Sequence, residues 1–189
     1  MLFQHLDYSA KQIKFSSKSG ELIVEKSAEG LSMNFPATMP SSCDAPQPLL
    51  DGLNGSEAET ILADFDYVIV LPSAEDVIEL QPDFTAWNKL DRRGVIVTAK
   101  SNDSSNDDNI DFVSRCFYPT LNVEEDPVTG SAHCIIAPYW AAQLNKTIVV
   151  GKQVSARSGE VHCQLLGDRV VLTGQCVDYM QGEIRLPAY

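Results

Sequence analysis

The chain has 189 residues, and its 26 acidic and 14 basic side chains give a formal net charge of −12. A surface that binds phosphate backbones needs clustered lysine and arginine, and the sequence has no such cluster. We therefore expect neither nucleic acid nor an anionic membrane as a partner. With 44% hydrophobic and 21% charged residues, the composition is that of a globular protein rather than of a disordered segment.

Neither the start of the chain nor its cysteines indicate secretion. The first fifteen residues lack a basic region followed by an apolar stretch, which is the pattern of a secretory signal. The five cysteines are odd in number and form no C-x-x-C pair: Cys43, Cys116, Cys134, Cys163 and Cys176. These features predict free thiols in a reducing compartment, and hence a cytoplasmic protein.

The first forty residues predict a three-stranded β-meander. Apolar and polar residues alternate in three short stretches, and Gly20 and Gly30 mark the turns between them. Three strands alone are marginally stable, so we expect another element or chain to cover the apolar face of this sheet. That face comprises Ile13, Phe15, Leu22, Val24, Leu31, Met33 and Phe35.

Four prolines between residues 36 and 48 predict a linker and a boundary between residues 1–40 and residues 41–189. Periodicity and turn residues then predict both helices and strands. The expected helices are residues 57–64, 74–80, 84–90 and 131–144. The expected strands are residues 67–71, 94–99, 110–117, 161–166, 169–173 and 182–186. The fold class is therefore mixed α+β, with more strand than helix.

The sequence predicts no zinc or calcium site. The three histidines (His5, His133 and His162) share no ligand spacing with the cysteines, which argues against zinc. The acidic loop at residues 103–111 lacks the glycine and the glutamate that a calcium loop needs at its sixth and twelfth positions. We interpret it as a solvated hairpin loop.

The segment EEDPVTGSAH, residues 124–133, is the candidate functional site. Gly130 and Ser131 open a helix whose first backbone N–H groups have no partner within the helix. Those groups and the positive end of the helix dipole form a receptor for a carboxylate or a similar anion. Gly130 allows close approach, Ser131 adds a hydroxyl, and Asp126 is placed to move a proton beside the anion.

The same spacing also fits a purely structural interpretation. In it Thr129 or Ser131 caps the helix and Asp126 complements the helix dipole, which is the commoner role of such residues. His133 is a lone histidine in the first turn and is expected to be structural. Cys134 is expected to be buried and inert rather than a nucleophile.

The predicted helix is apolar on nearly all sides, so we expect sheet around it. Pro138 has no N–H and leaves the carbonyl of Cys134 without its usual donor. In the preceding strand, Asp111 and Arg115 share a face at a period of two residues, which predicts an ion pair between them. Arg157 is placed either to pair with an acid or to reach an anion.

The run EDPVTGSAH, preceded by DFVSRCFYP and followed by APYWAAQLNK, resembles the PhzF-like family of phenazine-biosynthesis-type isomerases and epimerases. The later runs QVSARSGEV and GDRVVLTGQ resemble the closing segment of that family, where a Q-x-S-x-R-G-G pattern is usual. Ser158 stands at the first of the two glycines of that pattern. The resemblance is close over residues 111–182 and looser elsewhere.

The resemblance implies a diaminopimelate-epimerase-like fold, in which two similar halves each wrap a sheet around a central helix. The active site would lie in the cleft between the halves. Catalysis would consist of proton transfers on a small carboxylate-bearing molecule, without a cofactor. By the same resemblance Asp126 and Ser131 would be catalytic, and the substrate would be bound by Thr129, Gly130, Ser131 and Ala132.

Three segments of the family's N-terminal half do not occur in this sequence: G-N-P-A, an S-E-T-like motif with the catalytic glutamate, and a G-H-A-T-like helix start. Residues 1–40 therefore resemble only the last strands of that half, which gives roughly one and a third of the two halves. We expect the C-terminal part of a truncated or split isomerase, which forms a homodimer or pairs with a complementary N-terminal half. The alternative is a non-catalytic anion-binding or assembly module that retains the fold.

Overall fold

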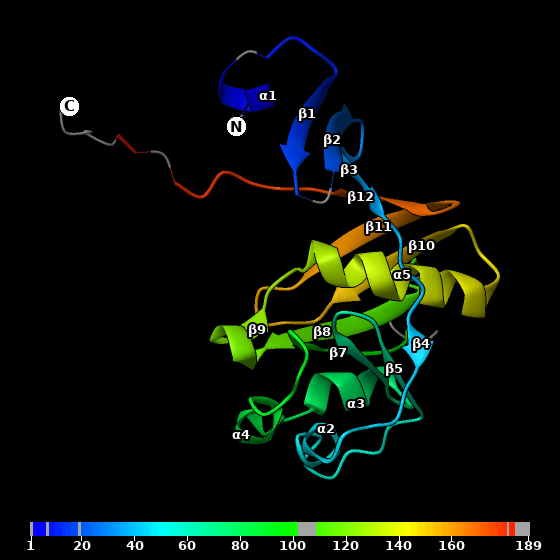
Figure 1. Ribbon diagram of the computed structural model, residues 1–189. Helices are drawn as coiled ribbons and strands as arrows, with labels where there is room; N and C mark the ends of the chain where they lie inside the picture. Colours follow the sequence, from blue (N-terminus) through cyan, green and yellow to red (C-terminus); the bar gives the residue numbers. More distant parts are fainter. Residues whose placement is uncertain (1, 7, 19, 102–108, 181, 184–189) are drawn as a thin grey trace.

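The computed structural model describes residues 2–6, 8–18, 20–101, 109–180 and 182–183 (Figure 1). The helices are α1 (Leu2–His5), α2 (Gln47–Asp51), α3 (Ala74–Glu79), α4 (Phe84–Trp87) and α5 (Gly130–Leu144), with a 3-10 turn, η1, at Pro119–Leu121. The strands are β1 (Gln12–Ser17), β2 (Gly20–Ser27), β3 (Gly30–Pro36), β4 (Ser41–Ser42), β5 (Thr60–Ala63), β6 (Tyr67–Val70), β7 (Val95–Lys100), β8 (Phe112–Tyr118), β9 (Val123–Asp126), β10 (Ile148–Gln153), β11 (Gly159–Leu166) and β12 (Arg169–Gly174).

The strands of the described chain form one twelve-stranded sheet in the order β1-β2-β3-β12-β11-β10-β8-β7-β6-β5-β4, and β9 pairs with β8. The β6–β7 and β8–β10 pairs are parallel, and the other pairs are antiparallel. The meander predicted for the first forty residues is confirmed, and β3 joins it to the rest of the sheet through β12. The fold is mixed α+β, with the sheet wrapped around α5 (Figure 1).

Two hydrophobic cores lie on opposite faces of the central strands, which explains the apolar run of β6. Val68 and Val70 belong to the core that surrounds α5. Tyr67 and Ile69 alternate with them and belong to the second core, with residues of α2, α3 and α4. The strand predicted at residues 67–71 is therefore confirmed, and it is buried on both faces.

The central helix α5 is surrounded by protein, as its all-round apolar sequence predicts. It packs against β7, β10, β11 and β12. Its buried residues are Ala132, His133, Cys134, Ile135, Ile136, Ala137, Pro138, Trp140 and Ala141. A helix buried on this scale is fixed in place by its surroundings, so the position of its first turn is well defined.

The helix predicted at residues 57–64 is wrong. Residues 60–63 form β5, which pairs antiparallel with both β6 and β4. The β-branched Thr60 and Ile61 suit a strand, and the tertiary pairing prevails over the helix-forming residues that precede them. The proline-rich stretch is not free of regular structure either, because it contains β4 and leads into α2.

Besides β4 and α2, the sequence does not predict α1, η1, β9 and β10. The remaining described elements agree with the predicted ones. The predicted strand at residues 182–186 and the predicted loop at residues 103–111 lie largely outside the described residues.

All five cysteines are free, as predicted. Among the described residues no group of three metal-binding side chains comes together. No helix in the same part of the chain has the length and apolar character needed to cross a bilayer.

Candidate functional site

The start of α5 has unpaired backbone donors. The N–H of His133 donates to the carbonyl of Thr129 at 3.3 Å, and the N–H of Thr129 donates to Oε1 of Gln153 at 2.8 Å. The N–H groups of residues 130–132, between these two, find no acceptor among the described residues. They are the orphan donors of a helix N-terminus, and they match the residues proposed from the sequence.

The capping interpretation of Thr129 and Ser131 is wrong. A cap requires a side-chain oxygen that accepts from a helix N–H, and neither hydroxyl does so. The Thr129 hydroxyl instead donates to Oδ2 of Asp126 at 2.5 Å. The half-buried carboxylate of Asp126 is thereby held directly upstream of the helix start.

Gln153, at the end of β10, anchors the loop before α5 and was not identified from the sequence. Its side chain is fully buried. Its amide nitrogen donates to the carbonyl of Asp126 at 2.6 Å and to Oγ1 of Thr129 at 3.1 Å. Since its oxygen also accepts the Thr129 N–H, one amide side chain makes three bonds to residues 126–129. The available signal was its place as the first residue of the Q-x-S-x-R pattern.

The rest of that pattern also contacts the loop. The Ser155 hydroxyl donates to the carbonyl of Pro127 at 2.7 Å. A Cβ at Gly159 would lie 2.5 Å from a methyl carbon of Val128, so a larger residue there would force Val128 to move. Ser158 has a φ of +38°, a backbone conformation that favours glycine. Ser155 and Gly159 therefore help to hold the loop that carries the site.

Arg93 contacts the site from the other side and was also missed. Its guanidinium donates to Oγ of Ser131 at 3.0 Å and to both carboxylate oxygens of Asp66, at 3.0 and 2.5 Å. The same group lies over the rings of Phe65 and Tyr118, at 4.8 and 5.1 Å from their centroids. No motif marks Arg93 or Asp66, because they are far from Ser131 in sequence.

The electrostatics around this pair disfavour a protein base among the neighbouring groups. The hydrogen bonds that Arg93 donates to Asp66 raise the pKa of Arg93, so the guanidinium stays charged. Burial raises the pKa values of the Tyr118 hydroxyl and the Cys116 thiol, which keeps both protonated.

His133 lies in the core rather than at the site. It is fully buried, and its Nδ1 lies 2.8 Å from the carbonyl of Thr129, which assigns the ring proton to Nδ1. Its Nε2 has no partner within the described part of the chain, and burial lowers its pKa. Burial also raises the pKa of Cys134 to about 11, so this cysteine remains a thiol, as expected.

The predicted ion pair between Asp111 and Arg115 is wrong. Arg115 pairs through both fork nitrogens with Glu125 of β9, at 2.8 and 3.0 Å, and also donates to carbonyls at the end of α3. Asp111 pairs with Lys146 at 2.5 Å instead. The antiparallel β8–β9 pairing brings Glu125 beside Arg115, and this ion pair fixes the strand that ends at Asp126.

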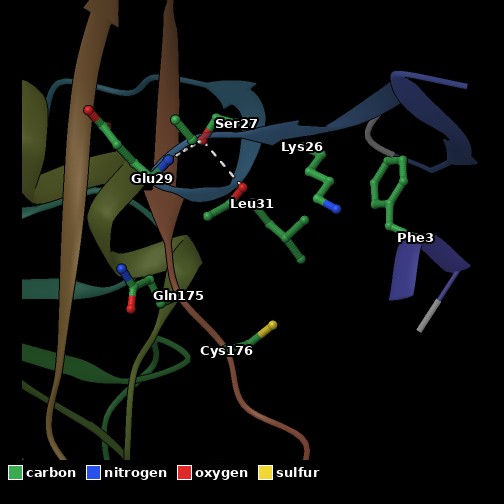
Figure 2. A pocket seen from close by; sticks show the side chains of 9 residues that line it. Phe3, Lys26, Ser27, Glu29, Leu31, Gln175 and Cys176 are labelled. Atoms are coloured by element: carbon green, nitrogen blue, oxygen red, sulfur yellow. Dashed lines mark hydrogen bonds between the residues drawn. The ribbon is translucent and has the colours of Figure 1, made fainter. Parts of the chain in front are cut away.

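Two of the hollows in the described part of the chain lie near the start of β3 and the end of β12. The smaller, of about 280 Å³, lies between α1, the β2–β3 turn and the segment after β12, with Lys26 and Cys176 in its lining (Figure 2). The larger, of about 1330 Å³, includes Val128, Arg157 and Gly159 in its lining. Because Val128 directly precedes Thr129, the larger hollow reaches the loop before α5. Arg157 is exposed there and makes no ion pair with any described residue.

The model of the phenazine biosynthesis-like protein family (PhzC-PhzF) matches residues 1–182. An uncharacterized isomerase of Pseudomonas aeruginosa is 42% identical over 186 residues, which cover 98% of this chain and 69% of the relative. An uncharacterized isomerase of Halalkalibacterium halodurans is 41% identical over 180 residues, which cover 94% of this chain and 66% of the relative. The similarity therefore includes the first 110 residues, where the sequence pattern alone was loose.

Solved structures give the same result. The crystal structure of a PhzF-family phenazine biosynthesis protein from Enterococcus faecalis has a TM-score of 0.89 at 36% identity, and the match covers 98% of this chain and 69% of that one. A predicted epimerase from Pseudomonas aeruginosa shares the fold, with a TM-score of 0.57 at 16% identity and coverage of 92% and 67%. The chain thus spans about two thirds of the length of these proteins.

Proposed function

The chain belongs to the phenazine biosynthesis-like (PhzF-like) family. We propose that it forms part of a cofactor-independent isomerase or epimerase. The reaction would transfer protons on a small carboxylate-bearing substrate. The observation that carries this proposal is the uncapped start of α5, where three free backbone donors lie next to the Asp126 carboxylate.

The first step is the binding of the substrate carboxylate. The free N–H groups of Gly130, Ser131 and Ala132 and the hydroxyl of Ser131 would receive it, aided by the helix dipole. A Cβ at Gly130 would have no neighbour closer than 3.9 Å, so the backbone is open to close approach. Thr129 would contribute by holding Asp126 in place.

The second step is proton transfer, in which Asp126 acts as an acid–base or relay group. The hydrogen bond from the Thr129 hydroxyl holds its carboxylate just before the helix start. Abstraction of a proton from carbon also needs a base within hydrogen-bond reach of that proton. In the family resemblance that base is the glutamate of the S-E-T-like motif, which this sequence lacks.

We therefore place this chain as the C-terminal part of a truncated or split enzyme, with residues 1–40 as the remnant of the other half. A complementary N-terminal half, or a second copy of the chain, would complete the cleft. The enzyme would act in the cytoplasm. Exposed apolar side chains support a missing partner surface: Val177 is 91% exposed, Tyr179 98% and Met180 84%.

A non-catalytic anion-binding or assembly module is the second candidate. It is favoured because three described residues near the helix start are not suited to act as the base: Cys116 and Tyr118 stay protonated, and His133 is buried in the core. This candidate keeps the anion receptor and assigns Asp126 only a structural role.

Exchange of substrate α-hydrogen with deuterated water distinguishes the two. We expect no exchange by the isolated chain with small α-substituted carboxylates. Adding a separately produced N-terminal half of a relative should restore exchange, and Asp126→Asn should abolish it again. A complex that forms and binds carboxylate but never exchanges hydrogen would favour the module. Exchange by the isolated chain would contradict the need for an external base.

A further inference from the structure

We propose that Arg93 is a positioning residue, which turns the hydroxyl proton of Ser131 toward a carboxylate bound at the start of α5. The inference rests on the proposed function, because it concerns the same anion receptor. It assigns a role to Arg93, which is not part of the sequence pattern and is not one of the groups proposed to contact the anion.

The Arg93 guanidinium is fixed in both position and plane. Asp66, whose side chain is fully buried, receives two of its N–H groups. The rings of Phe65 and Tyr118 lie against the guanidinium. A two-point ion pair with packed rings leaves the remaining N–H groups with a defined direction, and one of them reaches Oγ of Ser131.

This contact decides what the Ser131 hydroxyl can do. A hydroxyl has one proton to donate and two lone pairs that accept. Because Arg93 can only donate, it occupies a lone pair of Oγ and leaves the proton unused. No acceptor for that proton exists among the described residues. The Ser131 hydroxyl is therefore left as a donor at the helix start, beside the free N–H groups of the first turn.

The charge of Arg93 is not itself the attraction. Asp66 neutralises it at 2.5 Å, so the pair as a whole brings no net charge to the site. The effect of Arg93 on an anion should therefore pass through Ser131. Experiments can therefore distinguish positioning of the Ser131 hydroxyl from a general electrostatic effect of Arg93.

Titration of the isotope-labelled chain with acetate tests the proposal, with the amide shifts of residues 130–132 as the readout. Arg93→Lys keeps a cation for Asp66 but lacks the fork that joins it to Ser131. We expect about threefold weaker acetate binding, because the freed Ser131 hydroxyl keeps its proton but distributes it over about three staggered orientations. Arg92→Lys is the matched control: Arg92 lies over the Tyr67 ring and donates to the Asp64 carbonyl, without contacting Ser131. Its affinity should change less than twofold.

A double-mutant cycle with Ser131→Ala separates positioning from a structural role. In the Ser131→Ala background, Arg93→Lys should have no further effect on acetate affinity. The Arg93→Met/Asp66→Asn variant avoids a buried unpaired charge and should match Arg93→Lys. Equal effects of Arg93→Lys with and without the Ser131 hydroxyl, or affinity within twofold of the parent chain, would overturn the inference alone. Failure of the parent chain to bind acetate would overturn the proposed function as well.

Discussion

The backbone N–H of Thr38 donates a 3.0 Å hydrogen bond to the carbonyl oxygen of Cys134, inside the central helix. Pro138 lies four residues after Cys134 and has no N–H, so the helix cannot satisfy this carbonyl itself. The stretch between β3 and β4 replaces the missing donor. The neighbouring N–H of Ala37 bonds to the carbonyl of Asp168 at 2.9 Å. The proline-rich segment is thus tied to both α5 and the β11–β12 turn.

Removing this donor should destabilise the protein. Thr38→Pro deletes the N–H and leaves the Cys134 carbonyl unpaired, which should lower the free energy of unfolding by about 1–3 kcal/mol. Urea unfolding measures the change. Met39→Pro is the control, because Met39 is 53% exposed and its N–H makes no bond to a described residue. Equal losses in both variants would show that chain stiffening, not the hydrogen bond, causes the effect.

The sequence predicts best where one local pattern decides the structure. The all-round apolar run after Gly130 predicts a buried helix, and the TGS start predicts free donors, because both depend only on neighbouring residues. β9 has three acids in four residues and no apolar alternation, so its pairing with β8 had no local signal.

The other parts of the site depend on long-range contacts. Arg93 is 38 residues from Ser131, and Gln153 is 24 residues from Thr129. Which arginine or glutamine reaches the helix start is set by the strand order, and periodicity does not encode strand order. The prediction of an Asp111–Arg115 ion pair was wrong for the same reason, because a partner on a neighbouring strand competes with one on the same strand.

Gly151 should not tolerate a side chain. An added Cβ would lie 2.4 Å from the Phe112 ring and 3.1 Å from Nε2 of His133, both fully buried. We expect Gly151→Ala to reduce the free energy of unfolding by about 1–3 kcal/mol, as overpacking does. Thermal and urea unfolding provide the measurement. At Gly174 an added Cβ would make only an ordinary contact at 3.6 Å, so Gly174→Ala should cost clearly less. A Gly151→Ala variant as stable as the parent would contradict this packing.

Ser158→Gly should stabilise the protein. Ser158 has a φ of +38°, which disfavours a residue with a Cβ by about 1–2 kcal/mol, whereas glycine adopts it freely. The greater freedom of glycine in the unfolded chain offsets part of this gain, so we expect a net increase below about 1 kcal/mol. The backbone N–H that bonds to Ser155 remains. Asn122→Gly, at φ +59°, is the comparison and should gain less, because asparagine tolerates this region.

Acid should destabilise the fold through His133. Burial lowers its pKa in the folded state, so near its ordinary value of about 6.5 the unfolded chain binds the proton more readily. Stability is therefore present above that value and falls as the pH drops below it, by at most about 1.4 kcal/mol per pH unit. Unfolding curves between pH 7 and 5 should show this slope for the parent chain and for the exposed-site control His162→Gln. His133→Gln should lack it, and an unchanged slope would refute the assignment.

We expect the chain to self-associate or to form a tight complex with another chain. The meander is only partly covered, since Ile13 is 9% exposed but Phe15 is 45% exposed. After β12 the chain also exposes Val177 and Tyr179 almost completely. Apolar surface of this kind favours burial against a partner.

Sedimentation at micromolar concentration should show a dimer, and Val177→Asp/Tyr179→Asp should shift it toward monomer. Leu121→Asp changes an exposed apolar residue on η1 and should leave the association unchanged. A stable monomeric parent chain would contradict the prediction, and equal dissociation by the Leu121 control would assign the interface to another surface.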